Sequence, residues 1–153
     1  MDELKQQAKY ISEFLPKITR NLRIAPLIDE VKPGLTTSQL MVLLILKEAK
    51  DTALPVGKLT QELAVSFPSV SGIVDRLHKE KLIKRFYSKQ DRRLVLLKLT
   101  TTGSEIVEKL INAFEELIYA VLKEMPISEQ KSISKAIENV FTFSTILSKS
   151  FPQ

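Results

Sequence analysis

A short polar segment near the middle of the chain concentrates cations that could contact phosphate groups. Its residues are Lys89, Gln90, Asp91, Arg92 and Arg93. It separates residues 83–88, rich in β-branched and aromatic side chains, from residues 94–99, which are almost continuously apolar. This pattern predicts a two-stranded hairpin with a basic tip. Guanidinium groups on such a tip can enter a narrow DNA minor groove, where negative potential is concentrated, although the charges could equally serve only to keep the tip soluble.

A second group of candidate contact residues lies on a helical segment just before the hairpin. Its apolar residues recur at the i, i+3, i+4, i+7 spacing of a helix with one buried face: Val70, Ile73, Val74 and Leu77. The outward face then carries groups suited to phosphates and base edges: Phe67, Pro68, Ser69, Ser71, Gly72, Asp75, Arg76 and Lys79. Hydroxyl and guanidinium groups can hydrogen-bond to DNA, and Phe67 or Pro68 can touch thymine methyls. Asp75 and Arg76 could instead form an ordinary solvated helix face.

The elements that would position these groups follow from local patterns. A short helix is predicted from Val56 to about Ala64, followed by a turn at Val65 and Ser66. Ser66 is the expected N-cap of the second helix, and Pro68 is tolerated in its first turn. Two short helices joined by a tight turn form a helix-turn-helix. The basic hairpin directly after it completes a winged helix-turn-helix, an order more specific than either half alone.

Longer helical patterns flank this unit on the N-terminal side. Apolar residues recur in steps of four and three at Leu4, Ala8, Ile11, Leu15, Ile18, Leu22 and Ala25. The spacing predicts one long helix with a narrow apolar seam, kinked or divided at Pro16 and Pro26. The seam could pack on a second subunit or on the helix's own core. Thr36 and Gln39 have the form of a capping box that starts a helix ending near Glu48.

Two further helices are predicted after the hairpin. Thr102 to Glu105 is a candidate capping box, although Thr100 could cap instead. The apolar face that follows ends at Pro126, and Ser128 is the expected N-cap of the last helix. The flanking helices carry more apolar surface than a small winged unit can cover, which favours a homodimer. The expected fold is therefore mainly α with a small β-wing: a winged helix-turn-helix lobe between N- and C-terminal dimerisation helices.

Composition narrows the function classes. The 153 residues carry a net charge of +5 and no cysteine, which suits a polyanionic partner and excludes disulfides and thiolate metal sites. The longest apolar run, Leu40 to Leu46, is far shorter than the roughly 20 residues of a membrane span. No signal-peptide core is recognised at the N-terminus, so a cytoplasmic location is expected. No catalytic motif is found, His78 is expected to face solvent, and we expect neither enzyme activity nor a cofactor.

Four short motifs occur in a characteristic order along the chain. They are Gly34-Leu35-Thr36 with Gln39 and Leu43, Val70-Ser71 with Val74-Asp75-Arg76-Leu77, Asp91-Arg92-Arg93, and Leu99-Thr100-Thr101-Thr102-Gly103. The last has the form LTxxG that begins a long helix. In this order and spacing the chain resembles the multiple-antibiotic-resistance-regulator (MarR) family of winged-helix transcriptional regulators, and the likeness covers nearly the whole chain. Two positions depart from the family pattern: Lys81, where the family usually has Gly, and Gly72, where relatives often carry Arg.

The resemblance implies a function and an organisation. Residues 1–153 would form a single domain, with a winged lobe at 34–100 and dimerisation helices at 1–30 and 101–150. A homodimer would bind a pseudo-palindromic operator in double-stranded DNA, acting as a repressor. Asp91 would pair with Arg93 and hold it extended, while Arg92 or Arg93 enters the minor groove. Because Gly72 has no side chain to contact a base, specificity would depend on its neighbours or on DNA shape.

The resemblance also implies an effector site. Relatives often bind small aromatic or phenolic anions between the dimer region and the DNA-binding lobe. Side chains of the first helix that could line such a pocket are Tyr10, Phe14, Arg20 and Arg23. The simpler alternative for these residues is packing at an interface together with solvated charge. Two other functions stay open: a non-specific DNA-compacting protein, and a winged-helix module that binds protein.

Overall fold

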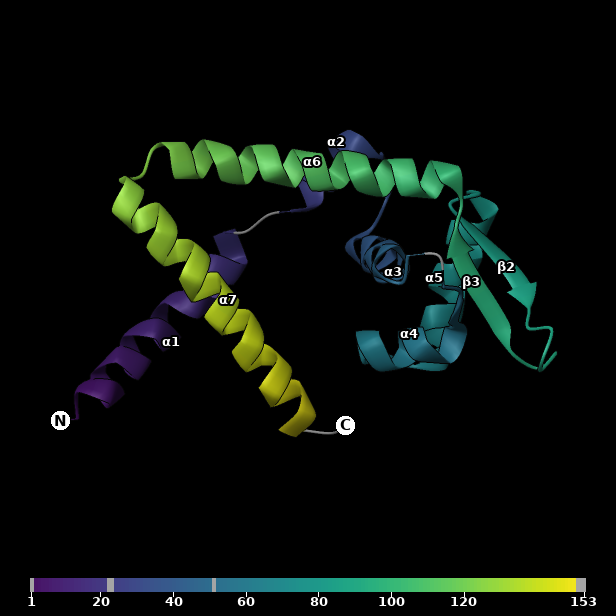
Figure 1. Ribbon diagram of the computed structural model, residues 1–153, viewed down its shortest axis with the longest axis horizontal. Helices are drawn as coiled ribbons and strands as arrows, with labels where there is room; N and C mark the ends of the chain where they lie inside the picture. The colour runs from purple at the N-terminus through teal and green to yellow at the C-terminus, as the bar shows by residue number, and fades with distance from the viewer. Residues whose placement is uncertain (1, 22–23, 51, 151–153) are drawn as a thin grey trace.

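The computed structural model describes residues 2–21, 24–50 and 52–150 and is mainly helical with one small sheet, as expected (Figure 1). The elements are α1 (Glu3–Asn21), α2 (Ala25–Val31), α3 (Thr37–Glu48), β1 (Leu54–Pro55), α4 (Val56–Leu63), α5 (Phe67–Lys79), β2 (Ile83–Tyr87), β3 (Val95–Leu99), α6 (Thr101–Lys123) and α7 (Ile127–Ser150). Helices α3 to α5 and the sheet form a lobe at one end of α6, while α7 and α1 lie toward its other end (Figure 1).

The sheet is antiparallel, with the strand order β1-β3-β2. The two strands of the predicted wing pair along their whole length, from Ile83 opposite Leu99 to Tyr87 opposite Val95. The sequence analysis missed β1, whose two residues pair with Leu96 and Leu97 of β3. A segment of two residues shows no alternation of apolar and polar side chains, so no sequence pattern marks it.

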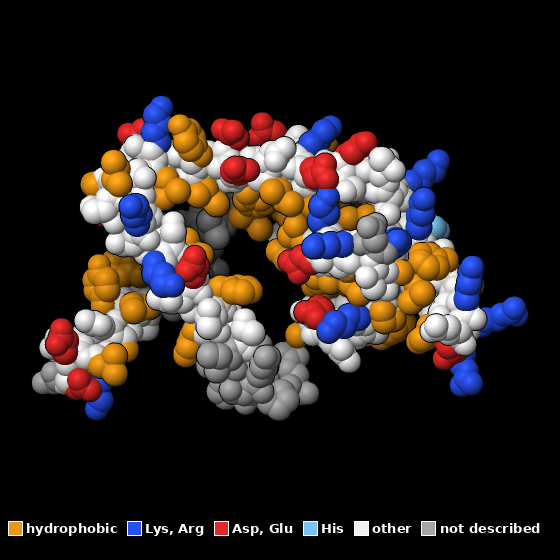
Figure 2. All heavy atoms as spheres, in the orientation of Figure 1, with side chains coloured by type: hydrophobic (Ala, Val, Ile, Leu, Met, Phe, Trp, Pro, Cys, Tyr) orange, Lys and Arg blue, Asp and Glu red, His pale blue; other side chains and the backbone are white. Residues whose placement is uncertain are grey.

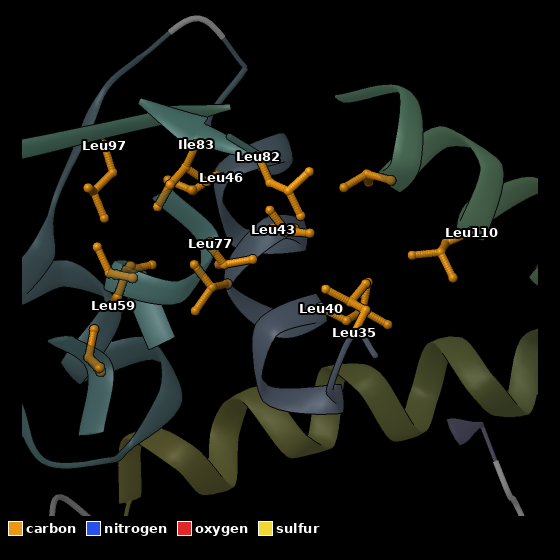
Figure 3. Packing of buried hydrophobic residues seen from close by; sticks show 14 of the residues in the cluster. Leu35, Leu40, Leu43, Leu46, Leu59, Leu77, Leu82, Ile83, Leu97 and Leu110 are labelled. Carbon is orange, nitrogen blue, oxygen red and sulfur yellow. The ribbon is translucent and has the colours of Figure 1, made fainter. Parts of the chain in front are cut away.

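The core joins the helix-turn-helix to the sheet and to the first part of α6. Figure 3 shows side chains from these elements pointing toward one another, and five that are completely buried are Leu43, Leu59, Leu77, Leu97 and Leu110. Burying a leucine of this kind contributes about 1.5–3 kcal/mol. Because Leu110 of α6 belongs to the same cluster as Leu43 of α3, the lobe and the long helix share one core.

The N-terminal helical region is divided, but only at one of the two expected prolines. Helix α1 continues across Pro16 and ends at Asn21, whereas α2 begins at Ala25 with Pro26 in its first turn. Proline fits the first turn of a helix because the N–H that it lacks would have no partner within the helix at that position. The helix is therefore not divided at Pro16, and a kink there stays a prediction. Of the seam residues, Leu4 and Ile11 are exposed, and the side chains at positions 15, 18 and 22 lie outside the described residues.

The predicted capping of α3 is confirmed. The Gln39 amide donates to the Thr36 hydroxyl at 3.3 Å, and the Thr36 amide donates to the Gln39 side-chain carbonyl at 2.8 Å. This reciprocal pair satisfies two amides that a helix start leaves without partners. The Gln39 side chain is buried, and its amide nitrogen makes no hydrogen bond in the described structure.

The starts of the last two helices differ from the first expectation. Thr100 caps α6, because its hydroxyl accepts from the Gly103 amide at 2.9 Å, so the capping box at Thr102 is wrong. Helix α7 begins at Ile127, so Ser128 lies inside it and is not its N-cap. The Pro126 carbonyl accepts from the Glu129 amide at 2.9 Å and thereby closes the first turn.

Candidate nucleic-acid interface

The face of α5 predicted to contact DNA is an exposed face. Val70, Val74 and Leu77 are completely buried and Ile73 is partly buried. The exposed residues are Phe67, Pro68, Ser69, Gly72, Asp75, Arg76 and Lys79. Ser71 is half-buried, so it is less open than its neighbours. The helix is therefore fixed by one apolar face and leaves a row of polar and aromatic groups free for a partner.

Ser66 occupies the N-cap position of α5, but its side chain makes no capping hydrogen bond. Its hydroxyl instead lies 2.9 Å from the Ser69 hydroxyl, and the two hydrogen-bond to each other. The first amides of a helix carry partial positive charge and point out of its N-terminus. Pro68 has no amide hydrogen, and the Val70 amide donates to the Ser66 carbonyl at 3.1 Å. Since the Ser66 side chain does not cap the helix, the remaining first-turn amides can donate to a phosphate oxygen there.

Gly72 lies at the middle of the exposed face of α5. A Cβ placed on it would have no heavy atom within 4 Å. The space above it is therefore open, and a partner can come close to the helix backbone. Glycine is not needed here for packing or for backbone conformation, since its φ is not in the left-handed region.

An ion pair joins α5 to the first strand of the wing. The Arg85 guanidinium donates to a carboxylate oxygen of Asp75. The sequence analysis treated Asp75 only as part of an outward polar face and missed this pair. Arg85 is opposite the buried Leu97 in the strand register, on the sheet face toward the helices, and that alternation was the available signal.

The wing tip is a closed turn whose hydrogen bonds are largely local. The Ser88 amide donates to the Leu94 carbonyl, and the Leu94 amide to the Asp91 carbonyl, each at 3.0 Å. The Ser88 hydroxyl accepts from the Gln90 and Asp91 amides at 3.2 and 3.3 Å. These bonds hold the hairpin tip in one conformation and leave its cationic side chains to project from it, as Figure 2 shows at the right-hand edge.

Asp91 acts mainly on the backbone of the wing. Its carboxylate accepts from the Arg93 amide at 2.9 Å, whereas the Arg93 Nε lies 3.9 Å away. The Arg93 side chain is 95% exposed, and Lys89 and Arg92 are exposed as well. A hollow of about 530 Å³ is lined by Lys89 and Arg92 together with Tyr87 and Ser88. The tip thus offers an aromatic ring, a hydroxyl and cations to one partner.

The turn that leads from α5 into the wing contains a strained residue. Lys81 has a φ of +59°, in the left-handed region that side chains other than glycine seldom occupy. The chain folds back there because the Leu82 amide donates to the Leu77 carbonyl at 2.9 Å. The Thr100 hydroxyl donates to the Lys81 carbonyl at 2.7 Å and so ties this turn to the start of α6. His78 is exposed, and its Nδ1 lies 3.2 Å from the Ile83 carbonyl.

The four residues of the candidate effector pocket are only partly brought together. The rings of Tyr10 and Phe14 lie 4.7 Å apart and are tilted by 43°, with the Lys17 ammonium 4.7 Å from the Phe14 ring centre. Tyr10 is 64% exposed, and Arg20 is also exposed on α1. Arg23 lies outside the described residues. Tyr10 also borders a shallow hollow with Gln6, Gln7 and Ile11.

Within residues 2–21, 24–50 and 52–150 there is no group of three or more histidine, cysteine or acidic side chains that could hold a metal ion. In the same ranges no helix combines the length and the apolar character that crossing a membrane requires.

Comparison with known proteins places the winged lobe in a known family. Residues 35–95 match the model of the MarR family. The repressor YetL of Bacillus subtilis, an HTH-type transcriptional repressor, is 25% identical over 108 residues, which are 71% of this chain and 65% of YetL. The chain spans 62–65% of the length of two of the curated relatives it matches.

Solved structures extend the likeness beyond the lobe. The crystal structure of RV1404 from Mycobacterium tuberculosis has a TM-score of 0.76 and 26% identity, covering 88% of this chain and 91% of that one. FabT of Streptococcus pneumoniae, solved in complex with DNA, has a TM-score of 0.75 and 21% identity, covering 92% and 99%. The flanking helices as well as the winged lobe therefore follow a known arrangement.

Proposed function

We propose that this chain, which belongs to the MarR family, is a sequence-specific transcriptional regulator that binds double-stranded DNA as a homodimer. One observation carries the proposal: helix α5, with its exposed face, and strand β2, which leads to the cationic wing tip, are joined by the Asp75–Arg85 ion pair. Helix α5 then serves as the recognition helix in the major groove, and the wing serves as a minor-groove contact. The relatives that are named transcriptional regulators support the same function.

In this proposal the contacts of α5 in the major groove contribute mainly to sequence specificity, and those of the wing contribute mainly to affinity. Ser69, Ser71 and Arg76 are proposed to contact base edges or phosphates, with Phe67 and Pro68 against thymine methyls and Lys79 on the backbone. Arg92 or Arg93 is proposed to enter the minor groove, with Lys89 on a phosphate and Asp91 holding the turn. Since Gly72 offers no side chain, part of the specificity is assigned to DNA shape.

The exposed apolar surface of the flanking helices supports a homodimer. Figure 2 shows hydrophobic side chains along the underside of α6 and along α7. Residues of these two helices that are more than 40% exposed are Ile111, Leu117, Ile118, Tyr119, Val121, Ile127, Ile137, Val140, Phe141 and Phe143. Large exposed apolar side chains gathered on two helices are typical of an interface in a soluble protein. We propose residues 34–100 as the DNA-binding lobe and residues 1–30 and 101–150 as the dimerisation helices.

The dimer is tested by sedimentation analysis of the Phe141→Asp variant. A charge in an apolar interface carries a large desolvation cost, so a mainly monomeric variant is expected. The control is Tyr87→Asp, which puts the same charge at a similarly exposed aromatic position on the wing and should stay dimeric. A Phe141→Asp protein that remains a dimer as tight as the original would contradict the proposed interface.

Repression and an effector are further parts of the proposal. Repression is favoured because YetL is named a repressor. A small phenolic or aromatic effector is proposed near Tyr10 and Phe14, whose contact offers an apolar platform, with Arg20 and Arg23 as candidate cations. Such a ligand acts only if it binds more tightly to one spacing of the two lobes than to the other. The pseudo-palindromic operator follows from the two-fold symmetry of the dimer.

The decisive experiment is fluorescence anisotropy with the protein's own upstream intergenic duplex and a scrambled duplex across a salt series. A sequence-specific regulator should prefer the native duplex by about 10³ or more, with a steep salt dependence. Equal affinity for both duplexes would favour a non-specific DNA-compacting protein. This alternative is tested because Gly72 has no side chain with which to contact a base. Absence of binding to either would favour a protein-binding module.

A further inference from the structure

A hollow of about 500 Å³ lies where the end of α3, strand β3 and the start of α6 meet. Its lining includes three lysines, Lys47, Lys50 and Lys98, together with Thr101 and Ser104. Figure 2 shows cationic side chains gathered below the end of α6 nearest the sheet. We call this feature the lysine hollow. It is as large as the pockets that bind small molecules in other proteins.

The lysine hollow is separate from the proposed DNA-binding groups. Lys98 follows the buried Leu97 on β3, and successive side chains of a strand point to opposite faces of the sheet. Lys98 therefore lies on the face away from the one that carries Leu97 and its partner Arg85, the residue paired with α5. None of the residues lining the hollow belongs to α5 or to the wing tip.

The positive charge here is concentrated at a cost in stability. Lys98 is directly opposite Lys84 in the strand register, and like charges at such positions repel. Lys50 has a φ of +52°, a conformation that is unfavourable for a lysine. In the described part of the chain neither Lys50 nor Lys98 forms an ion pair. An anion in the hollow would offset this repulsion.

The third lysine is held in place by α6. The Lys47 ammonium donates to the Glu108 carboxylate at 2.5 Å and to the Ser104 hydroxyl at 3.0 Å. The hydrogen bond and the charge of Lys47 lower the pKa of Glu108, so this carboxylate is ionised at neutral pH. Lys47 therefore joins the lobe to α6 at the edge of the hollow, while Lys50 and Lys98 keep their charge for another partner. The Thr100 hydroxyl already caps α6 at this point, so the inference rests on the lysines.

We propose that the lysine hollow binds a phosphate group, carried by a small phosphate ester or by the backbone of DNA flanking the operator. A lysine ammonium is a compact point charge, and phosphate provides several acceptor oxygens within one small group. Because the lining comes from α3, β3 and α6, a bound phosphate would connect the winged lobe to the long helix. The phosphate site itself does not depend on the function proposed above, whereas flanking DNA as the source of the phosphate rests on it.

The test is a titration with pyrophosphate at constant ionic strength, followed by calorimetry and by NMR shifts of lysine side chains. Saturable binding to the original protein is expected. Lys98→Gln and Lys50→Gln should each weaken the affinity for pyrophosphate about tenfold, as expected for the loss of one charge-assisted hydrogen bond. Lys98→Arg keeps the positive charge and should retain most of the affinity. Lys123→Gln, at the far end of α6, is the control that should bind normally. Lack of saturable binding, or equal loss in the control, would overturn the proposal.

A second arm identifies the source of the phosphate. Affinity is measured for a short operator duplex and for one with long flanks, with the original protein and Lys98→Gln. Loss of affinity for the long duplex alone assigns the site to flanking DNA, whereas unchanged DNA binding with lost pyrophosphate binding assigns it to a free phosphate ester. A protein that binds pyrophosphate but no duplex would contradict the regulator function and leave the lysine hollow standing.

Discussion

Arg85 on β2 and Asp75 on α5 form an ion pair that joins the wing to the proposed recognition helix. The two residues are ten positions apart in sequence, and the turn at Lys81 lies between them. Since the wing and α5 are proposed to enter neighbouring grooves, this pair fixes the distance between two DNA contacts. Because an ion pair this exposed contributes little to stability, its expected role is to orient the wing relative to α5.

Replacing Asp75 by Asn should weaken DNA binding several-fold while changing the free energy of unfolding by less than about 1 kcal/mol. The wing then samples more orientations, and ordering it on DNA costs entropy. Anisotropy and chemical denaturation measure the two effects. A double-mutant cycle with Arg85→Ala provides the control: additive losses in DNA affinity would show that the pair does not act as a unit.

Removing both wing arginines, with Arg92→Ala and Arg93→Ala together, should weaken binding to all duplexes and reduce the salt slope by about 4 for the proposed homodimer, two cations from each protomer. Each cation removed from the protein means that about one counterion fewer is released from the DNA on binding. Ser69→Ala should instead change the preference among operator sequences more than the overall affinity. If both variants lose specific and non-specific binding in the same proportion, the assignment of α5 as recognition helix fails.

Lys81→Gly should stabilise the protein by up to about 1 kcal/mol. The left-handed conformation costs a non-glycine residue about 1–2 kcal/mol, which glycine would not lose. Because glycine has more conformational freedom in the unfolded chain, part of this stabilisation is offset. Thermal or urea unfolding measures the change. Lys79→Gly, two residues earlier at the end of α5, is the matched control and should destabilise by up to about 1 kcal/mol. Destabilisation by Lys81→Gly would show that the lysine side chain makes a stabilising contact.

Gly103→Ala and Gly72→Ala should have opposite effects on stability. A Cβ on Gly103 would lie 2.0 Å from the Leu82 carbonyl oxygen, so α6 and the turn must move apart, at a cost of about 1–3 kcal/mol. A Cβ on Gly72 meets open space, and alanine is favoured over glycine in a helix by about 1 kcal/mol. Equal effects in urea unfolding would contradict the close approach of α6 to the turn.

The stability of the protein should fall in acid partly through Glu108. Its pKa is lowered in the folded state by the hydrogen bond and charge of Lys47. A lowered folded-state pKa contributes stability that is present above the unfolded value and is lost as the pH falls through the folded value. The Glu108→Gln variant should therefore show a shallower loss of stability on acidification than the original protein. Identical pH profiles for the two proteins would show that Lys47 does not stabilise the ionised form of Glu108.

Local chemistry made much of the fold predictable. The capping box at Thr36, the buried face of α5 and the two wing strands each depend on residues close in sequence, and each was found as expected. The start of α6 depends on a distant group, because the Gly103 backbone must fit against Leu82. Sequence spacing therefore allowed both Thr100 and Thr102 as caps, and only packing distinguishes them.

The sequence predicts which face of α5 is exposed, but it does not predict which side chains of the candidate interface contact one another. The outward residues of α5 follow from helical spacing, whereas the pairing of Asp75 with Arg85 depends on the register of β2 against β3. The lysine hollow was not predictable, since Lys47 of α3 and Lys50 of the turn after it meet Lys98 of β3 only after folding. Neither arrangement has a local pattern that a sequence could reveal.

Helix α6 has a mechanical consequence for the distance between the two DNA-binding lobes of the proposed homodimer. Its buried residues, Gly103, Val107 and Leu110, all lie in its first half. The helix extends for 23 residues, or about 35 Å at 1.5 Å per residue. It therefore works as a lever: a tilt of about 10° at the lobe moves the opposite end by about 6 Å over that length. Small changes near the lobe are thus converted into displacements comparable to two base-pair steps.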